Sequence, residues 1–407
     1  MQSWYAAPPV PVAGTPLPLQ LWDTASGTLK PASEGATATM YVCGITPYDA
    51  THLGHAATYL TYDLVHRALL DNGKRVVYVQ NVTDIDDDIL KRARESNIDW
   101  AALGRRETTL FRADLAALNV LPPTQYLGAV ESMTAIVDLI ARLHDAGAAY
   151  DVDGDIYFSI ASAEGFGTVA GLDADTMRAL SAERGGDPDR PGKKDPLDPL
   201  LWFAQRPGEP GWESPWGPGR PGWHVECAAI ALTTLGMPID VQGGGTDLAY
   251  PHHEMCAAAA QVATGTWPFA RSFVHTGMVA LDGTKMSKSL GNLVFVRDLR
   301  AEFPPAAVRL ALLAHHYRSD WTWTQADITD AVARAELWRA GVAAAAPGSG
   351  DDVIAAIRAA LADDLDAPAA LAAVDVWATA AVGAGGSDAK AGKPVKQAIN
   401  SLLGVSL

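Results

Sequence analysis

Residues 39–55 read TMYVCGITPYDATHLGH, so that an apolar run, a glycine turn and a pair of histidines follow one another directly. Thr39–Cys43 is rich in β-branched and aromatic side chains, which is typical of a buried strand. A helical pattern covers residues 56–72 and stops at Gly73, and Arg75–Gln80 again has the character of a strand. A strand, a helix and a strand in this order predict a βαβ unit, and we therefore expect a parallel sheet with a right-handed crossover.

Further elements are predicted along the rest of the chain. Helical patterns lie near residues 105–118 and 130–147, and Asp153-Gly154 between apolar flanks predicts a hairpin. Strand-like segments return at 239–241 and 273–275, and the chain becomes Ala-rich and helical after residue 301. We therefore expect an extended lead-in over residues 1–36, an α/β domain over 37–300 with an insert over about 120–222, and an α-helical C-terminal domain over 301–407.

The bulk composition is that of a soluble globular protein with an acidic surface. The formal net charge is −16, and hydrophobic residues make up 48% of the chain. Such a charge disfavours a polyanionic partner, because Lys and Arg dominate nucleic-acid affinity. Three cysteines form no disulfide framework, and neither a signal peptide nor a membrane span is apparent. We expect a cytoplasmic, monomeric protein without a membrane or nucleic-acid partner.

The turn after the first strand is a candidate nucleotide site. In parallel α/β folds, phosphates bind where a strand ends and a helix begins. Two imidazoles, His52 and His55, flank a glycine there and can donate hydrogen bonds to phosphate oxygens, although such a pair alone arises often by chance. Lys285–Ser289 (KMSKS) adds ammonium groups suited to the charge on a departing pyrophosphate, and its alternative interpretation is a solvated basic loop.

The HLGH and KMSKS segments together resemble the two signatures of the class I aminoacyl-tRNA synthetases. The resemblance implies a Rossmann-like class I synthetase core with a parallel sheet, followed by a C-terminal α-helical bundle. It also implies ATP, with Mg²⁺, bound between the two segments. By this resemblance His52 and His55 contact the phosphates, while Lys285 and Lys288 stabilise the reacting phosphorus and its leaving group.

The three cysteines and two histidines allow two interpretations. Their spacing does not match a finger-type zinc site, so from spacing alone buried apolar cysteines with unrelated histidines are favoured. However, the segments around Met40–Tyr48, Gly219–Cys227 and Gly243–Glu254 closely resemble cysteinyl-tRNA synthetases. That resemblance implies one Zn²⁺ bound by Cys43, Cys227 and His252. Those synthetases usually supply a Glu where this chain has Cys256, so whether Cys256 is a fourth ligand stays open, with three protein ligands favoured.

A zinc ion would explain how the site selects cysteine. Cysteine and serine differ by one atom, and steric discrimination of that kind is worth only about 1–3 kcal/mol. A thiolate is a much better zinc ligand than a hydroxyl, and zinc deprotonates a thiol that binds it. We therefore expect L-cysteine as substrate, without a separate editing domain.

Other residues are expected to bind the cysteine or the nucleotide, with the turn at 245–247 suited to adenosine and ribose, and each has turn geometry or core packing as the alternative. They are Cys43, Gly44, Ile45, Thr46, Thr58, Asn81, Val82, Thr83, Trp223, Gly245, Thr246, Asp247 and Val279. The acidic run at 84–88 permits a Mg²⁺ ion, a substrate amine or a helix cap.

The acceptor of the activated cysteine is predicted from finer resemblances. The CGITPYDATHLGHA segment and Glu183–Pro188 (ERGGDP) are similar to the cysteine ligases of mycothiol biosynthesis, which are synthetase-derived. That family joins cysteine to the amine of glucosaminyl-inositol through a cysteinyl-adenylate. A short cysteinyl-tRNA synthetase is the alternative, but the residues after Ser289 are too few for both a helical bundle and an anticodon domain, and they are acidic. A non-catalytic zinc module is disfavoured by the intact HLGH and KMSKS segments.

Overall fold

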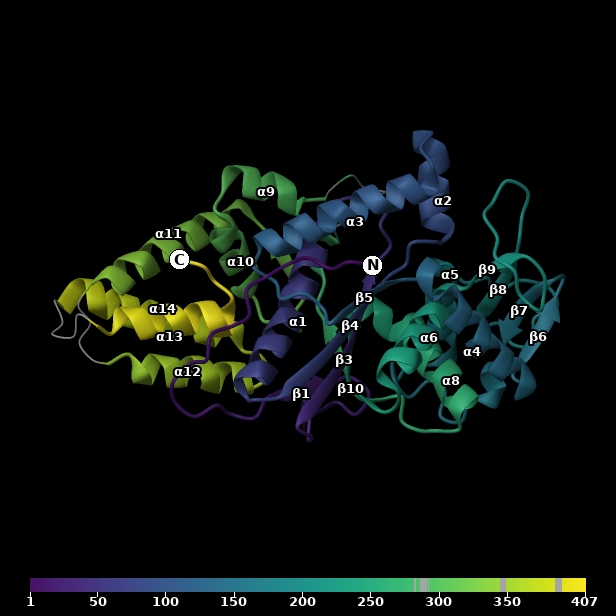
Figure 1. The fold of residues 1–407 in the computed structure, drawn as a ribbon, viewed down its shortest axis with the longest axis horizontal. Coiled ribbons are helices and arrows are strands. Elements are labelled where there is room, and N and C mark those ends of the chain that lie inside the picture. The colour runs from purple at the N-terminus through teal and green to yellow at the C-terminus, as the bar shows by residue number, and fades with distance from the viewer. Residues whose placement is uncertain (282, 286–290, 292, 345–348, 385–389) are drawn as a thin grey trace.

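The computed structural model describes residues 1–281, 283–285, 291, 293–344, 349–384 and 390–407. Its centre is a five-stranded parallel sheet, flanked by a C-terminal helical part at one end and by the insert at the other (Figure 1). The strand order is β11-β10-β3-β4-β5. The strands are β3 (Thr37–Ile45), β4 (Arg75–Val82), β5 (Gln125–Gly128), β10 (Ile239–Gly245) and β11 (Ala270–Thr276).

The predicted βαβ unit is confirmed. Strands β3 and β4 pair in parallel, with Met40 opposite Tyr78, and α1 (Leu53–Asp71) connects them. The chain fills one side of the sheet with β4 and β5 and then returns to place β10 on the other side of β3. The strand order therefore reverses between β3 and β10. In open α/β sheets, a crevice forms at such a reversal, outside the carboxyl ends of the strands.

Both faces of the sheet are covered, and β3 shows why. Met40 and Val42 belong to the core cluster formed with α1 and the C-terminal helices. Tyr41 and Cys43 belong to a second cluster, formed with α4 (Met133–Asp145), α6 (Trp223–Leu235) and α8 (Glu254–Thr264). Because successive strand side chains point to opposite faces, one apolar strand supplies both layers.

The insert carries a small antiparallel sheet at the end of the molecule opposite the C-terminal helices (Figure 1). The hairpin expected at Asp153-Gly154 joins its first two strands. The predicted domain bounds remain predictions, but β5 pairs with β4 in the central sheet although it falls inside the range given to the insert. The antiparallel sheet of the insert contains β6 (Ala149–Val152), β7 (Asp155–Phe158), β8 (Leu200–Ala204) and β9 (Gly219–Pro221). In the chain, α5 (Ala174–Glu183) lies between β7 and β8.

The C-terminal helices pack on α1 through a buried ionic cluster. Asp63 on α1 accepts hydrogen bonds from Arg67 at 2.7 Å and from Arg309. Arg309 lies on α10 (Pro305–Leu313) and also donates to the Leu403 carbonyl at 2.7 Å. Burial lowers the pKa of Arg309 to about 10, against the effect of Asp63. The remaining C-terminal helices are α11 (Gln325–Ala343), α12 (Asp351–Ala362), α13 (Ala367–Ala384) and α14 (Gly392–Leu403).

The other elements are short or peripheral. The N-terminal residues form a hairpin, β1 (Gln20–Asp23) with β2 (Thr28–Pro31), and Trp4 is buried with its indole nitrogen on the Val120 carbonyl at 2.8 Å. No helix among the described residues is long and apolar enough to span a membrane. The rest are α2 (Asp87–Ser96), α3 (Trp100–Ala117), η1 (Val130–Ser132), η2 (Ile160–Ser162), α7 (Thr246–Leu248), η3 (Ala249–His253), β12 (Val279–Leu281), β13 (Thr284–Lys285), α9 (Val296–Glu302) and β14 (Trp321–Trp323).

Candidate functional site

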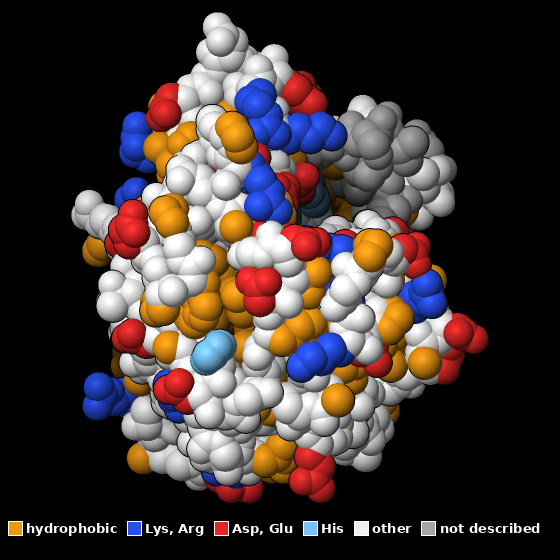
Figure 2. Space-filling view, turned by 90° about the vertical axis from the view of Figure 1, so that its right-hand side faces the viewer, with side chains coloured by type: hydrophobic (Ala, Val, Ile, Leu, Met, Phe, Trp, Pro, Cys, Tyr) orange, Lys and Arg blue, Asp and Glu red, His pale blue; other side chains and the backbone are white. Residues whose placement is uncertain are grey.

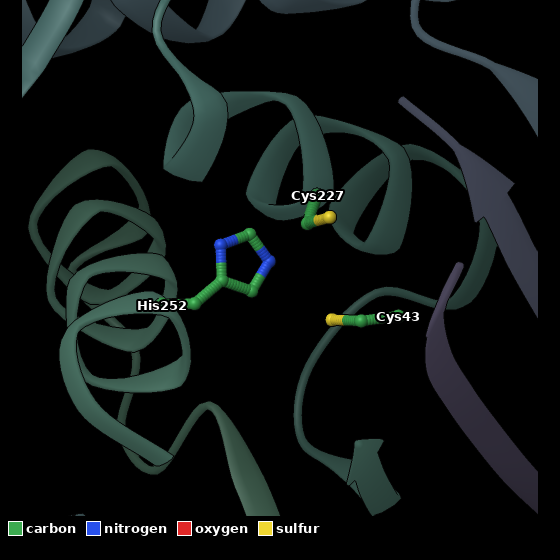
Figure 3. Close-up of side chains that lie close together, drawn as sticks. All are labelled: Cys43, Cys227 and His252. Atoms are coloured by element: carbon green, nitrogen blue, oxygen red, sulfur yellow. The ribbon is translucent and has the colours of Figure 1, made fainter. Parts of the chain in front are cut away.

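Two thiols and one imidazole converge beside the sheet reversal. Cys43 comes from the end of β3, Cys227 from α6, and His252 from η3 after β10 (Figure 3). One ligand atom from each lies within 4.8 Å of the others, and all three side chains are buried. Burial, reinforced by the neighbouring Cys227 thiol, raises the pKa of the Cys43 thiol well above its ordinary value. A cation between these groups would favour the deprotonated thiols instead.

The surroundings of His252 leave one of its nitrogens available to a ligand. Its Nδ1 lies 3.0 Å from Nδ1 of His224, and its ring stacks on Trp223 with centroids 4.4 Å apart. The buried Nε2 has no hydrogen-bond partner among the described residues. Buried polar atoms rarely stay unsatisfied without a functional reason. The donor set of two thiols and an imidazole therefore fits Zn²⁺, which prefers sulfur and nitrogen ligands.

Cys256 does not join this group in the structure. Its thiol donates to the His224 carbonyl at 3.1 Å, so it braces the start of α6. Glu226, next to Cys227, is fully buried, and both its carboxylate oxygens are without a hydrogen-bond partner among the described residues. Burial raises the pKa of Glu226 well above its ordinary value.

A chain of buried polar groups lies behind Cys43. Nε2 of His253 is 3.3 Å from the Cys43 sulfur, and its Nδ1 is 2.8 Å from Nε2 of His275. His275 in turn bonds Thr24 through its Nδ1 at 2.7 Å. Outer partners of this kind orient metal ligands. Thr24, His253 and His275 are far apart in the chain, and the His252-His253 pair was the one signal of this relay in the sequence.

The loop that carries His252 is held by the segment 183–188. Arg184 donates to the carbonyl of Asp247 at 2.7 Å and to that of Tyr250. Ser181 bonds the Tyr250 hydroxyl at 2.9 Å. Arg184 therefore positions the loop, a role that the sequence alone did not predict.

The end of β3 requires glycine at position 44. A Cβ on Gly44 would lie 1.6 Å from the Asn81 carbonyl oxygen, and the Gly44 amide donates to the Asn81 side chain at 2.8 Å. Asn81 also donates to the Thr83 hydroxyl at 3.3 Å, and the Thr83 amide donates to the Ile45 carbonyl at 3.0 Å. Val82 pairs with Ile45 in the sheet. The predicted contacts at the ends of β3 and β4 thus lie together, at the carboxyl ends of the two strands.

The end of β10 lies beside the end of β3 and is also made of glycines. A Cβ on Gly243 would lie 2.3 Å from the ring of Tyr62 on α1, whose hydroxyl lies within hydrogen-bonding distance of the carbonyls of Gly244 and Val274, at 2.8 and 2.7 Å, and accepts from the Gly244 amide. Gly245 caps α7, which contains Thr246 and Asp247. A side chain at Gly244 would meet Leu248 and His253, so the protein's own side chains fill the space that Gly243 and Gly244 leave. The Tyr62 side chain holds the end of β10 against α1, and the sequence did not predict this role.

His52 and His55 lie together at the N-terminus of α1. Their rings stack with centroids 3.8 Å apart. The segment after the KMSKS loop packs against them, because Leu53 donates to the Val294 carbonyl at 2.9 Å and His52 is bridged to Phe295. Thr58, one turn further along α1, bonds Thr276 at 2.9 Å, and Val279 is buried in β12.

The predicted lysines are only partly covered by the structure. The backbone of Lys285 pairs with Ala280 in the β12–β13 hairpin. Lys288 lies outside the described residues, as does the rest of 286–290. The contacts of both ammonium groups stay predictions.

For the acidic run, the helix-cap interpretation is borne out at one residue. The Asp86 side chain accepts from the Ile89 amide at 2.9 Å and caps α2. It also accepts from the Thr46 hydroxyl at 3.0 Å, which ties α2 to the turn after β3. Burial raises the pKa of Asp86 to about 6.

Comparisons with known proteins agree with this arrangement. Residues 29–333 match the family of class I tRNA synthetase (C) catalytic domains. A protein of Thermomonospora curvata is 60% identical and one of Streptomyces coelicolor 57% identical, each over the whole of both chains. Both are named L-cysteine:1D-myo-inositol 2-amino-2-deoxy-alpha-D-glucopyranoside ligase.

Solved structures agree on the fold. Methionyl-tRNA synthetase of Mycobacterium tuberculosis, in complex with methionyl-adenylate, superposes with a TM-score of 0.64 at 18% identity. The match covers 90% of this chain and 92% of that one. The predicted fold class, an α/β class I synthetase core followed by C-terminal helices, is confirmed.

Proposed function

This chain belongs to the class I synthetase family, in the branch of the L-cysteine:1D-myo-inositol 2-amino-2-deoxy-alpha-D-glucopyranoside ligases, and from that membership we propose how its residues share the reaction. The enzyme ligates L-cysteine to the amine of glucosaminyl-inositol in mycothiol biosynthesis. The cysteine carboxylate attacks the α-phosphorus of ATP, giving cysteinyl-adenylate and pyrophosphate. The sugar amine then attacks the activated carbonyl, and an amide and AMP result.

The convergence of Cys43, Cys227 and His252 is the observation that carries the cysteine half of the proposal. These residues would hold a Zn²⁺ ion, which binds the substrate thiol as a thiolate when it is present. His224 and Trp223 fix the orientation of the His252 ring. The relay from His253 to Thr24 keeps the sulfur of Cys43 in place.

The ATP half is assigned to the crevice between β3 and β10. The N-terminus of α1, with His52 and His55, would receive the phosphates, because helix N-termini attract anions. The turn from Gly245 to Asp247 would receive the adenosine, and Mg²⁺ would accompany ATP. Lys285 and Lys288 are assigned to the transition-state charge on the α-phosphorus and pyrophosphate. The open mouth of the crevice would admit the acceptor amine.

A product assay tests this proposal. Zinc-loaded protein is supplied with ATP and cysteine and with either glucosaminyl-inositol or tRNA as acceptor. We expect an amide on the amino sugar and no charged tRNA, and we expect cysteine-dependent ATP–pyrophosphate exchange without any acceptor. Charging of tRNA at comparable efficiency would contradict the proposal.

The charge distribution on the surface favours the amino sugar over tRNA as the acceptor. On the end of the molecule that carries the insert, described Lys and Arg side chains are interspersed with Asp and Glu (Figure 2). The whole chain has a net charge of −16. A tRNA-binding surface would need a locally basic stripe. The cytoplasmic location and the monomeric state remain predictions.

A further inference from the structure

An open cleft of about 520 Å³ lies between α2 and the loop that joins β8 to β9. Figure 1 shows this loop rising beside α2. Leu90 and Ala93 form an apolar floor, and Arg94, Asn97, Asp99, Trp100 and Glu209 supply charged, polar or aromatic groups to its walls. The mixture of one ring, a guanidinium group, carboxylates and an amide around a small apolar floor is that of a site for a polar small molecule.

The cleft is connected to the candidate site by charged side chains. Thr46, in the turn after β3, bonds Asp86 at the start of α2. The next residue, Asp87, is paired with Arg220, which lies three residues before Trp223. Arg220 also faces Glu209 in the wall of the cleft, with 3.6 Å between its Nε and the Glu209 Oε2. From Asp86 to Arg94, α2 runs for about 12 Å at 1.5 Å per residue. The cleft is therefore within reach of a two-ring acceptor whose amine lies in the crevice.

Two atoms in this connection lack hydrogen bonds. Nε of Arg220 and Oε2 of Glu209 are buried and have no hydrogen-bond partner among the described residues. Their separation of 3.6 Å is too long for a direct hydrogen bond. The other carboxylate oxygen of Glu209, Oε1, lies 3.6 Å from the Arg94 guanidinium in the lining of the cleft, and a hydroxyl group of a ligand there can donate to this carboxylate and accept from Arg94.

We propose that this cleft binds the polyhydroxylated inositol end of the acceptor, so that its amine is presented to the activated carbonyl. The inference rests on the proposed function, since it deepens the acceptor half of that reaction. Hydroxyl groups both donate and accept, and Arg94, Asn97 and Glu209 in the lining offer both complements. The ring of Trp100, which also lines the cleft, packs against Trp212 with ring centroids 6.2 Å apart. The carboxylates of Asp99 and Glu209 are matched by the guanidinium groups of Arg94 and Arg220, and this balance suits a neutral polyol better than a phosphate chain.

The test separates acceptor binding from cysteine activation. Glu209→Gln removes the charge from the wall, and Glu213→Gln, an exposed position in the same loop, is the matched control. We expect Glu209→Gln to raise the KM for glucosaminyl-inositol about tenfold, the size of a lost hydrogen bond to a charged group. Cysteine-dependent ATP–pyrophosphate exchange, which needs no acceptor, should fall no more than in the control.

A truncated acceptor locates the end that is bound. With glucosamine in place of glucosaminyl-inositol, Glu209→Gln and the control should have equal KM values, because the inositol contact is missing. A second variant, Trp100→Leu, should also raise the KM for glucosaminyl-inositol while the exchange persists, which keeps the test valid if Glu209→Gln fails to fold.

The possible failures differ from one another. Unchanged KM values for glucosaminyl-inositol in both variants, with normal exchange, would overturn the cleft assignment alone. An equal rise in KM for glucosamine would also overturn it, since the effect would not involve inositol. Absence of cysteine-dependent exchange and of amide product in the unsubstituted enzyme would instead contradict the proposed function.

Discussion

The thiol–imidazole site and the α2 cleft differ in how the chain prepares them. In the first, Cys43, Cys227 and His252 are buried and braced by a second layer of histidines. In the second, Asn97 and Asp99 are exposed, and the polar atoms of Arg220 and Glu209 lie just beyond hydrogen-bonding distance. Cysteine differs from serine in a single atom, so a site that selects cysteine needs ligand atoms in fixed positions. A polyol has many hydroxyl groups and can be bound by side chains that change their conformation. Perturbing the buried site should therefore cost far more than perturbing the cleft.

The largest effect is expected at the thiols. Cys227→Ala removes one of three ligands, and we expect loss of bound zinc together with a fall in cysteine-dependent exchange of more than about 100-fold, beyond that of outer-layer changes. Metal analysis and exchange on the same sample measure both. Exchange at the full rate in metal-free protein would show that zinc does not hold the thiol. Cys256→Ala is the matched control and should retain the metal, because its thiol contacts the His224 carbonyl instead.

A backbone change beneath the site should be nearly as severe. Gly44→Ala would place a Cβ 1.6 Å from the Asn81 carbonyl oxygen, so the ends of β3 and β4 must separate. We expect the free energy of unfolding to fall by about 3 kcal/mol or more, since backbone strain adds to the lost packing. Urea unfolding measures it. Gly73→Ala is a useful comparison, because its Cβ meets nothing but its φ of +73° is strained. A smaller loss at Gly44 than at Gly73 would contradict the close-approach explanation.

The outer histidines should have an intermediate effect. His275→Ala breaks the relay from Thr24 to His253, and we expect the affinity for zinc to fall about 10- to 100-fold. Competition with a chelator measures the affinity. His275→Gln, which can still bond His253, should recover part of it. Equal affinities for all three proteins would mean that the relay is structural only.

The smallest effect concerns the link between the two sites. The pKa of Asp86 is raised to about 6 in the folded protein, chiefly by burial, from 3.8. A raised pKa means that the folded state binds the proton more tightly than the unfolded state. The contribution of Asp86 to the free energy of unfolding is therefore fully present below about pH 4 and is lost as the pH rises through 6. Asp86→Asn keeps the helix cap, because the Asn side-chain oxygen also accepts a hydrogen bond. Relative to the unsubstituted protein, the variant should gain about 1–3 kcal/mol more free energy of unfolding at pH 8 than at pH 4.

Unfolding curves at the two pH values provide the measurement. Asp88→Asn, an exposed neighbour on the first turn of α2, is the control and should change the pH dependence much less. A stability difference at pH 8 that is the same for both variants would indicate a general charge effect.

Much of the core could be predicted from the sequence because its signals are local. The βαβ unit around β3 follows from short apolar runs and from Gly73, and the paired strands confirm it. The convergence of Cys43, Cys227 and His252 could not be predicted from spacing, because these candidate metal ligands come from a strand end, a helix and an irregular turn that only the fold brings together. The resemblance to known synthetases supplied them.

What the sequence did not provide depends on contacts across the chain. The Cys43–His253–His275 relay joins residues of three elements, and nothing in their local sequence distinguishes a relay from core packing. Arg184 was one of several charged residues in an irregular segment until its bonds to the His252 loop were visible. The α2 cleft likewise pairs residues near 97 with residues near 209, and neither segment has a recognisable motif.

The alternation along β3 has a consequence for how the protein matures. Met40 and Val42 face one layer and Tyr41 and Cys43 the other, so a slip of one residue against β4 would turn the Cys43 thiol away from Cys227 and His252. A chain in the wrong register would lack the metal site, so metal binding would stabilise only the correctly paired sheet. Zinc in the cell would then shift the population of chains toward the correct strand pairing, and a shortage of zinc should increase the fraction of misfolded enzyme.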